Sequence, residues 1–159
     1  MQRNLEIRLA TAADEPGVRA FLEGLSDETL RLRYQTSVPM VRAWMVDAVV
    51  RPDHVMHEAI VAVHEGSVVG VAEWGRWEPG DTKADIAVVV RDDCRRHGIA
   101  RALLRRLARN ARAHGLETFA GTILSMNRAS VALLANVAPT KTVTLDGPVL
   151  EATIPLRSA

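Results

Sequence analysis

Apolar and polar residues alternate in several short stretches of this chain, a pattern that predicts β-strands with one buried face. The first stretch is Leu5–Leu9, where apolar residues are separated by charged ones. The stretch that ends at Val90 is almost wholly apolar over its last residues, as expected of a strand in the centre of a sheet. The predicted strands after the first are Glu58–His64, Ser67–Trp77, Thr82–Val90 and Thr118–Leu124. A two-residue turn at Asp146-Gly147 predicts a terminal hairpin.

A second pattern, with apolar residues three and four apart, predicts helices. The first helix is capped by Thr11 or Asp14 and runs to about Leu25, with an apolar stripe on one side. The later helices are predicted from Ser26 to Gln35, from Pro39 to Val50, from Ala100 to His114 and from Arg128 to Asn136, the last capped by Asn127. This order of elements predicts an α+β domain with a mixed, mostly antiparallel sheet.

The composition narrows the function classes. A chain of 159 residues is expected to form a single domain over residues 1–159. The formal net charge of +1 gives no general basic field, so no nucleic-acid partner is expected. Cys94 is the only cysteine, and we find neither a signal-peptide pattern nor an apolar run of membrane-spanning length. The expectation is therefore a cytoplasmic protein without a membrane partner, and its richness in Ala, Arg and Val suits a bacterial genome of high GC content.

The most informative segment for function is Arg95-Arg96-His97-Gly98-Ile99-Ala100, between a predicted strand and a predicted helix. The first amides of a helix have no partner inside it, and the aligned peptide dipoles leave positive charge there. Gly98 lets the main chain approach a ligand closely, because it has no Cβ. The segment therefore predicts a site for a diphosphate. The alternative is a plain turn in which the glycine serves only to reverse the chain.

These residues resemble the GCN5-related N-acetyltransferase (GNAT) superfamily. The resemblance rests on Ala84–Val90, on the spacing Arg95-x-x-Gly98-x-Ala100, and on Asn127 ahead of a further helix. It implies the GNAT fold, a mixed sheet of six to seven strands flanked by helices. Ser26–Tyr34, together with Ala84–Arg91, is similar to the acetyltransferase domain of bacterial protein lysine acetyltransferases of the Pat type.

The resemblance implies acetyl-CoA as co-substrate. Its pantetheine arm would run along the end of the strand at Val88, Val89 and Val90 as an added strand would. Its diphosphate would rest on the amides from Arg96 to Ala100, and Arg101 could help to neutralise a phosphate. Asn127 would approach the pantetheine arm, or serve only as a helix N-cap. The implied cofactor-binding residues are Val88, Val89, Val90, Arg95, Arg96, His97, Gly98, Ile99, Ala100, Arg101 and Asn127.

Acetyl transfer to an amine needs the neutral amine, and a lysine-like amine must spend roughly 4–5 kcal/mol to lose its proton at pH 7. Asp85 is the first candidate for the base, since it aligns with the strand glutamate of histone-type and Pat-type members. Asp85 is one methylene shorter than glutamate, so a relaying water could be required. The alternative for Asp85 is an exposed residue that is solvated or paired with Lys83. Glu73 is the second candidate for the base.

Two tryptophans are candidates for the acceptor pocket. A turn centred on Pro79-Gly80 would place Trp74 opposite Asp85, so that Trp74 and Trp77 could shape this pocket. Simple packing is the alternative for both.

The resemblance leaves two functions open. The first is an N-acetyltransferase in which a primary amine, of a small molecule or a protein lysine, attacks acetyl-CoA directly in a ternary complex. The second is a catalytically weak acyl-CoA-binding regulatory module, because Leu134 stands where many members carry an acid tyrosine. A homodimer is a further expectation from the superfamily.

Overall fold

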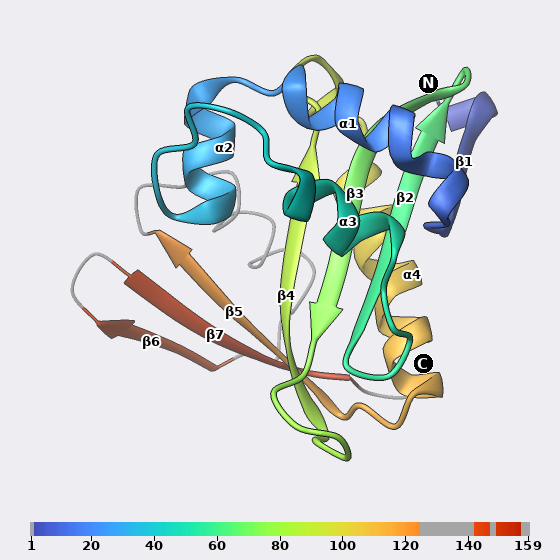
Figure 1. Cartoon of the computed structure of the whole chain (residues 1–159). Helices are drawn as coiled ribbons and strands as arrows, with labels where there is room; N and C mark the ends of the chain where they lie inside the picture. Colours follow the sequence, from blue (N-terminus) through green and yellow to red (C-terminus); the bar gives the residue numbers. More distant parts are fainter. Residues whose placement is uncertain (1, 125–141, 147–148, 157–159) are drawn as a thin grey trace.

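The computed structural model describes residues 2–124, 142–146 and 149–156. Its centre is a sheet of seven strands in the order β1-β2-β3-β4-β5-β7-β6 (Figure 1). The β4–β5 pair is parallel, and the other neighbouring pairs are antiparallel. The strands are β1 (Leu5–Leu9), β2 (His57–His64), β3 (Ser67–Gly75), β4 (Lys83–Val90), β5 (Thr118–Leu124), β6 (Thr142–Asp146) and β7 (Val149–Pro155). The expected mixed, mostly antiparallel sheet is confirmed.

Helices cover both faces of this sheet (Figure 1). On one face lie α1 (Glu15–Glu23), α2 (Asp27–Tyr34) and α3 (Ala43–Val50), and on the other lies α4 (Ile99–Ala113). Each face has its own hydrophobic core. Val18, Phe21 and Leu22 of α1 belong to the first core, and Leu103 and Leu107 of α4 belong to the second. Successive strand residues therefore point into different cores, which decides the side of the sheet on which each candidate residue lies.

The predicted cap of α2 is present. Ser26 has an extended backbone, and its hydroxyl accepts a hydrogen bond of 3.2 Å from the amide of Thr29. The short 3₁₀ turn Ala12–Asp14 ahead of α1 is stabilised by Asp14, whose carboxylate accepts a hydrogen bond of 2.8 Å from the amide of Thr11. Arg8 also donates to both oxygens of Asp14, at 2.8 and 2.7 Å, which ties β1 to the start of α1.

The predicted start of α3 at Pro39 is wrong, because the helix begins at Ala43. Val38 is buried and Val41 packs against the same core, and Pro39 and Met40 form a bend between them in place of a first helical turn. Tertiary packing outweighs the helix-starting tendency of proline at this point. Asn127 and the helix predicted after it lie outside the described residues, as does Gly147 of the predicted turn.

The register of the β3–β4 hairpin also differs from the prediction. Gly75 pairs with Asp85, and Trp74 pairs with Ile86. The prediction placed the centre of the turn half a residue too early, so that it paired Trp74 with Asp85. A slip of one residue moves a side chain to the other face of the sheet. Trp74 consequently lies in the α4 core, away from Asp85.

Gly70 of β3 allows the N-terminal half of α4 to pack directly on the sheet. A Cβ at this position would lie 2.8 Å from Cδ1 of Leu103 and 3.3 Å from the carbonyl oxygen of Val89. Leu103 is fully buried, so a shift of its side chain would disturb the packing around it. We expect Gly70→Ala to lower the free energy of unfolding by about 1–3 kcal/mol, as overpacking does. Thermal and urea unfolding measure this loss.

Gly75→Ala is the matched control on the same strand. Its added Cβ would meet nothing closer than 3.7 Å, at Cδ2 of His57. We therefore expect the free energy of unfolding of Gly75→Ala to stay within about 1 kcal/mol of the wild type. Equal losses in the two variants would contradict the proposed close approach of α4.

Candidate functional site

The first part of the site is a fork between β4 and β5. The two parallel strands pair at three positions, from Lys83 with Thr118 to Asp85 with Ala120. Beyond Asp85 they diverge (Figure 1), so this edge of β4 has no strand partner in the described part of the chain. Val88, Val89 and Val90 lie along the open edge, while β3 pairs with the other side of β4 as far as Val90. An extended ligand can hydrogen-bond such an edge as an additional strand would.

The second part is the Arg95–Ala100 segment, called the amide loop from here on. It follows a short 3₁₀ turn at Asp92–Cys94 and leads into α4, a helix of 15 residues. Gly98 is the residue before this helix and has a left-handed backbone with φ of +77°. Arg96 is also left-handed, with φ of +65°. Left-handed residues in a turn aim successive amides toward one point, which forms an anion-binding concavity.

The amides of the amide loop are available to a ligand. The first amide of α4 that has a main-chain acceptor is that of Ala102. It donates to the carbonyl oxygen of Gly98, the residue before the helix, at 3.0 Å. Between Arg95 and Arg101, no amide donates to any residue that the structure describes. Residues 95–98 are exposed. Unpaired amides and the positive end of the α4 dipole therefore converge on one exposed turn.

The side chains of the amide loop divide into two groups. The guanidinium of Arg95 points to the start of α2, where it donates to the hydroxyl of Thr29 at 2.7 Å and pairs with Asp92 at 3.2 Å. Arg96 and His97 are exposed, as is Arg101 on the first turn of α4. Arg95 thus joins the loop to α2, while the side chains of Arg96, His97 and Arg101 are open to solvent.

Asp92 reinforces the joint between the amide loop and α2. Its carboxylate accepts from the amide of Ser26 at 3.1 Å and from the hydroxyl of Thr29 at 2.6 Å. Burial would raise the pKa of Asp92, but the hydrogen bonds from Thr29 and Ser26 lower it below its ordinary value. An ionised Asp92 at the N-terminus of α2 also interacts favourably with the helix dipole.

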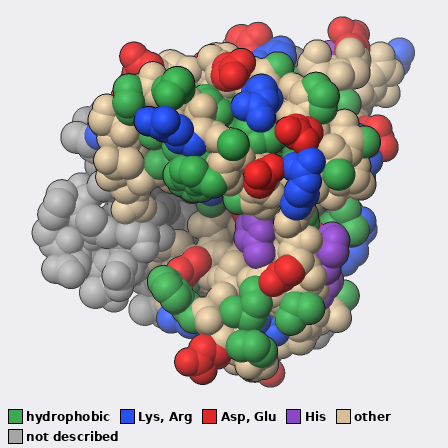
Figure 2. All heavy atoms as spheres, in the orientation of Figure 1, with side chains coloured by type: hydrophobic (Ala, Val, Ile, Leu, Met, Phe, Trp, Pro, Cys, Tyr) green, Lys and Arg blue, Asp and Glu red, His purple; other side chains and the backbone are tan. Residues whose placement is uncertain are grey.

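Asp85 lies at the point where β4 and β5 separate. Its side chain is exposed on the face covered by α1–α3 and makes no hydrogen bond or ion pair with another described residue. The pairing with Lys83 that was considered as an alternative is not observed. An open depression of about 580 Å³ begins here, lined by Asp85, Lys83, Trp77 and residues of β5 and β7. Figure 2 shows this face of the molecule, with a recess below the helices and acidic and histidine side chains along it.

Glu73 shares the face of Asp85 but has a different environment. It is 8% exposed, and both of its oxygens are engaged: Arg33 pairs with Oε2 at 2.7 Å, and Nε2 of His57 lies 3.1 Å from Oε1. Burial alone would raise the pKa of Glu73. The hydrogen bond from His57 and the charge of Arg33 outweigh burial, so this pKa is lowered below its ordinary value. Glu73 is therefore an ionised, paired carboxylate at neutral pH.

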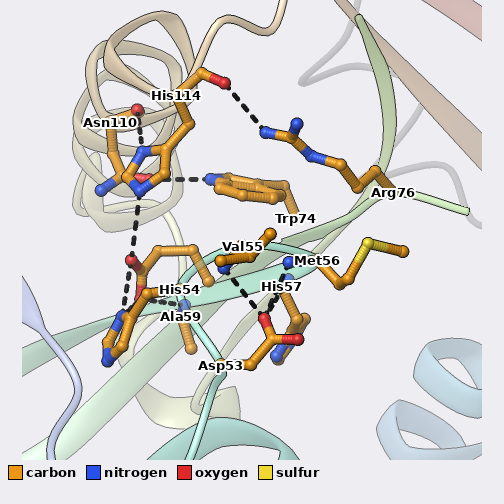
Figure 3. A network of polar contacts seen from close by, with 11 residues as sticks. Asp53, His54, Val55, Met56, His57, Ala59, Trp74, Arg76, Asn110 and His114 are labelled. Carbon is orange, nitrogen blue, oxygen red and sulfur yellow. Dashed lines mark hydrogen bonds and ion pairs between the residues drawn. The ribbon is translucent and has the colours of Figure 1, made fainter. Parts of the chain in front are cut away.

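The tryptophans lie on different faces. The indole Nε1 of Trp74 donates to Oδ1 of Asn110 on α4 at 2.8 Å, and Trp74 is fully buried. Figure 3 shows this bond, with Arg76 over the indole ring and bonded to the carbonyl oxygen of His114. Trp74 therefore packs in the α4 core and takes no part in the depression. Trp77, which is 80% exposed, does line the depression.

Arg33 and His57 were not identified from the sequence as partners of Glu73. Arg33 lies on α2 and His57 begins β2, 24 positions later in the chain. Only the folded chain brings both side chains to Glu73. His57 is held in place by Asp53, whose Oδ1 accepts from the amides of Val55, Met56 and His57 at 2.7 to 3.0 Å (Figure 3). An aspartate shortly before a strand was the available signal for such a turn.

Two broader expectations can be compared with the described residues. None of their helices has the length and apolarity needed to cross a membrane. The same residues contain no group of His, Cys, Asp or Glu side chains arranged to hold a metal ion.

Comparisons with known proteins identify the family. The model of the acetyltransferase (GNAT) family matches residues 12–137. An L-methionine sulfoximine/L-methionine sulfone acetyltransferase from Pseudomonas paraeruginosa is 35% identical over 132 residues, which cover 80% of this chain and 75% of that protein. The corresponding Pseudomonas aeruginosa enzyme is 34% identical over the same length.

Solved structures share the fold. The GNAT domain of PAT from S. lividans aligns with a TM-score of 0.87 and 23% identity, covering 95% of this chain and 90% of that one. The yncA protein of Salmonella typhimurium, solved with its cofactor acetyl-CoA, aligns with a TM-score of 0.77 and 20% identity, covering 99% and 96%. The chain therefore belongs to the acetyltransferase (GNAT) family, with acetyl-CoA as its co-substrate.

Proposed function

We propose that this protein transfers the acetyl group of acetyl-CoA to the primary amine of a small molecule, with Asp85 as the general base. The observation that carries the proposal is the fork between β4 and β5. A pantetheine arm on the open edge at Val88–Val90 would direct its thioester toward Asp85, while its diphosphate would lie on the amide loop. The depression at Asp85 is then the place for the acceptor.

The chemistry is a direct transfer within a ternary complex. The amine nitrogen forms a bond to the acetyl carbonyl carbon, the carbon–sulfur bond breaks, and CoA leaves as a thiolate that later takes up a proton. Asp85 accepts the proton that the ammonium must lose, directly or through one water. A thiol ionises far more easily than an alcohol, with an ordinary pKa near 8.5, so the leaving group needs little help from an acid.

The environment of Glu73 supports Asp85 over Glu73 as the base. Both oxygens of Glu73 are already engaged by Arg33 and His57, and its lowered pKa makes it a weak proton acceptor. Asp85 is exposed and makes no side-chain contact of this kind with the described residues. A free carboxylate beside the fork is the better-placed acceptor of a substrate proton.

The small-molecule acceptor is supported by the two Pseudomonas relatives, which are named for methionine sulfoximine and methionine sulfone. An assay of CoA release with a panel of acceptors tests it: L-methionine sulfone, other amino acids, polyamines and a lysine peptide. We expect turnover with at least one small amine. Turnover of the lysine peptide alone would favour a protein acceptor, and tight acetyl-CoA binding without any turnover would favour the regulatory module.

A further inference from the structure

Besides Lys83, Arg33 is a cationic side chain on the face of the sheet that carries Asp85. Its contacts hold it in one position. It lies in the last turn of α2, and its guanidinium pairs with Glu73 at 2.7 Å. The guanidinium carbon also lies 4.7 Å from the centre of the Tyr34 ring. The Arg33 side chain is only 23% exposed. A guanidinium held by a carboxylate and an aromatic ring loses little further entropy when it binds a ligand.

Arg33 keeps hydrogen-bond donors for a ligand. A guanidinium has five N–H groups, and Glu73 is contacted through Nη2. No hydrogen bond from Nε or Nη1 to another residue is found in the part of the chain that the structure describes, and the side chain is partly exposed.

The free donors of Arg33 lie on the same side of the sheet as Asp85. Glu73 pairs with Ala87 across the β3–β4 ladder, and Asp85 pairs with Gly75. Glu73 and Asp85 are therefore diagonal neighbours on one face, with Cα atoms about 7–8 Å apart. In an α-amino acid a single carbon separates the amine from the carboxylate. An amine beside Asp85 would bring its carboxylate toward the guanidinium above Glu73.

We infer that Arg33 binds the carboxylate of the acceptor, so that the preferred acceptors are small α-amino acids. This inference rests on the proposed function and adds the chemical class of the acceptor and the residue that selects it. A guanidinium suits this task because it binds a carboxylate through two parallel hydrogen bonds. Both sulfur-containing amino acids that name the Pseudomonas relatives carry such a carboxylate beside the amine.

Lys83 is the competing cation, since it lines the depression. Lys83 is exposed at the start of β4. Along this strand, Asp85 lies between Lys83 and Ala87, the residue that pairs with Glu73. An exposed, flexible ammonium is strongly hydrated and gives weaker selection of a planar carboxylate. A Lys83→Met variant therefore serves as the matched control for Arg33.

The test compares L-methionine sulfone with its carboxamide, which differ only in the carboxylate. We expect the wild type to favour the acid by about 10- to 100-fold in kcat/KM, the range of a charge-assisted pair of hydrogen bonds. Arg33→Met is expected to remove this preference by raising KM for the acid. Its kcat/KM for the carboxamide should change less than about threefold. Arg33→Lys should give an intermediate preference for the acid. Lys83→Met should retain the full preference of the wild type for the acid.

Arg33→Lys also guards against a folding defect, because it keeps a positive charge beside the buried Glu73. Calorimetry with the product N-acetyl-L-methionine sulfone in the presence of CoA gives a second readout. Arg33→Lys is expected to bind this carboxylate-bearing product about 10-fold more weakly than the wild type. Equal loss of both acceptors in the Arg33 variants would overturn the inference and leave Arg33 a structural role.

A wild type that accepts acid and carboxamide equally, or a preference that depends on Lys83, would also overturn the inference. In both cases a small amine is still acetylated, so the proposed function stands. If acetyl-CoA binds but neither compound nor any other small amine is acetylated, the proposed function and this inference fail together.

Discussion

Gly98→Glu is expected to weaken acetyl-CoA binding by at least about 100-fold. The added carboxylate would stand at the mouth of the amide loop, where a single negative charge about 4 Å from a phosphate costs about 4 kcal/mol near a protein surface. The left-handed backbone of Gly98, with φ of +77°, adds strain of about 1–2 kcal/mol for a residue with a side chain. Calorimetric titration with acetyl-CoA measures the effect.

Gly66→Glu is the matched control for this variant. Gly66 has nearly the same backbone, with φ of +79°, and a Cβ there would meet nothing within 4 Å. It lies in the turn between β2 and β3, so it carries the same charge and strain without touching the amide loop. We expect its affinity for acetyl-CoA to stay within about twofold of the wild type. Wild-type affinity in Gly98→Glu would instead refute the amide loop as the diphosphate site.

Asp85→Asn is expected to lower kcat about 100- to 1000-fold, the usual contribution of a general base. The amide has nearly the shape of the carboxylate but cannot accept the proton of the amine. Binding of acetyl-CoA should change less than about twofold, because the amide loop and the edge of β4 remain intact. Steady-state kinetics measure the effect on kcat, and calorimetric titration measures the binding of acetyl-CoA.

Asp85→Glu and Glu73→Gln complete this experiment. Asp85→Glu keeps a carboxylate and supplies the residue type of the resembled Pat-type domains, so we expect activity within about tenfold of the wild type. Glu73→Gln leaves Arg33 without its anionic partner and should mainly lower stability, by about 3–5 kcal/mol if the pair behaves as a buried one. Normal turnover in Asp85→Asn together with a large loss of kcat in Glu73→Gln would identify Glu73 as the base.

The site shows where sequence reasoning reaches its limit. The amide loop was predicted because its signal is local: a strand, a glycine and a helix follow each other within a few residues. The same holds for the Ser26 cap of α2. The register of the β3–β4 hairpin was missed by one residue, since the seven residues between the strands contain several turn-forming residues and do not fix the centre of the turn.

The different environments of Glu73 and Asp85 show a second limit of sequence reasoning. In the sequence both are acidic residues in predicted strands, and nothing local distinguishes a base from a structural anion. The distinction arises from partners that are distant in the chain: Arg33 lies 40 residues before Glu73, and His57 lies 16 residues before it. Because a pKa depends on such neighbours, the lowered pKa of Glu73 became visible only with the fold.

The sequence by itself determined the order of the main strands and helices, the strand–glycine–helix geometry of the amide loop and the family, because backbone preferences and short motifs are encoded by neighbouring residues. Tertiary structure alone decided that β4 and β5 diverge after Asp85, that Trp74 faces α4, and that Arg33 and His57 engage both oxygens of Glu73. These features depend on strand register and on packing between distant segments, which are set by the free energy of the whole folded chain.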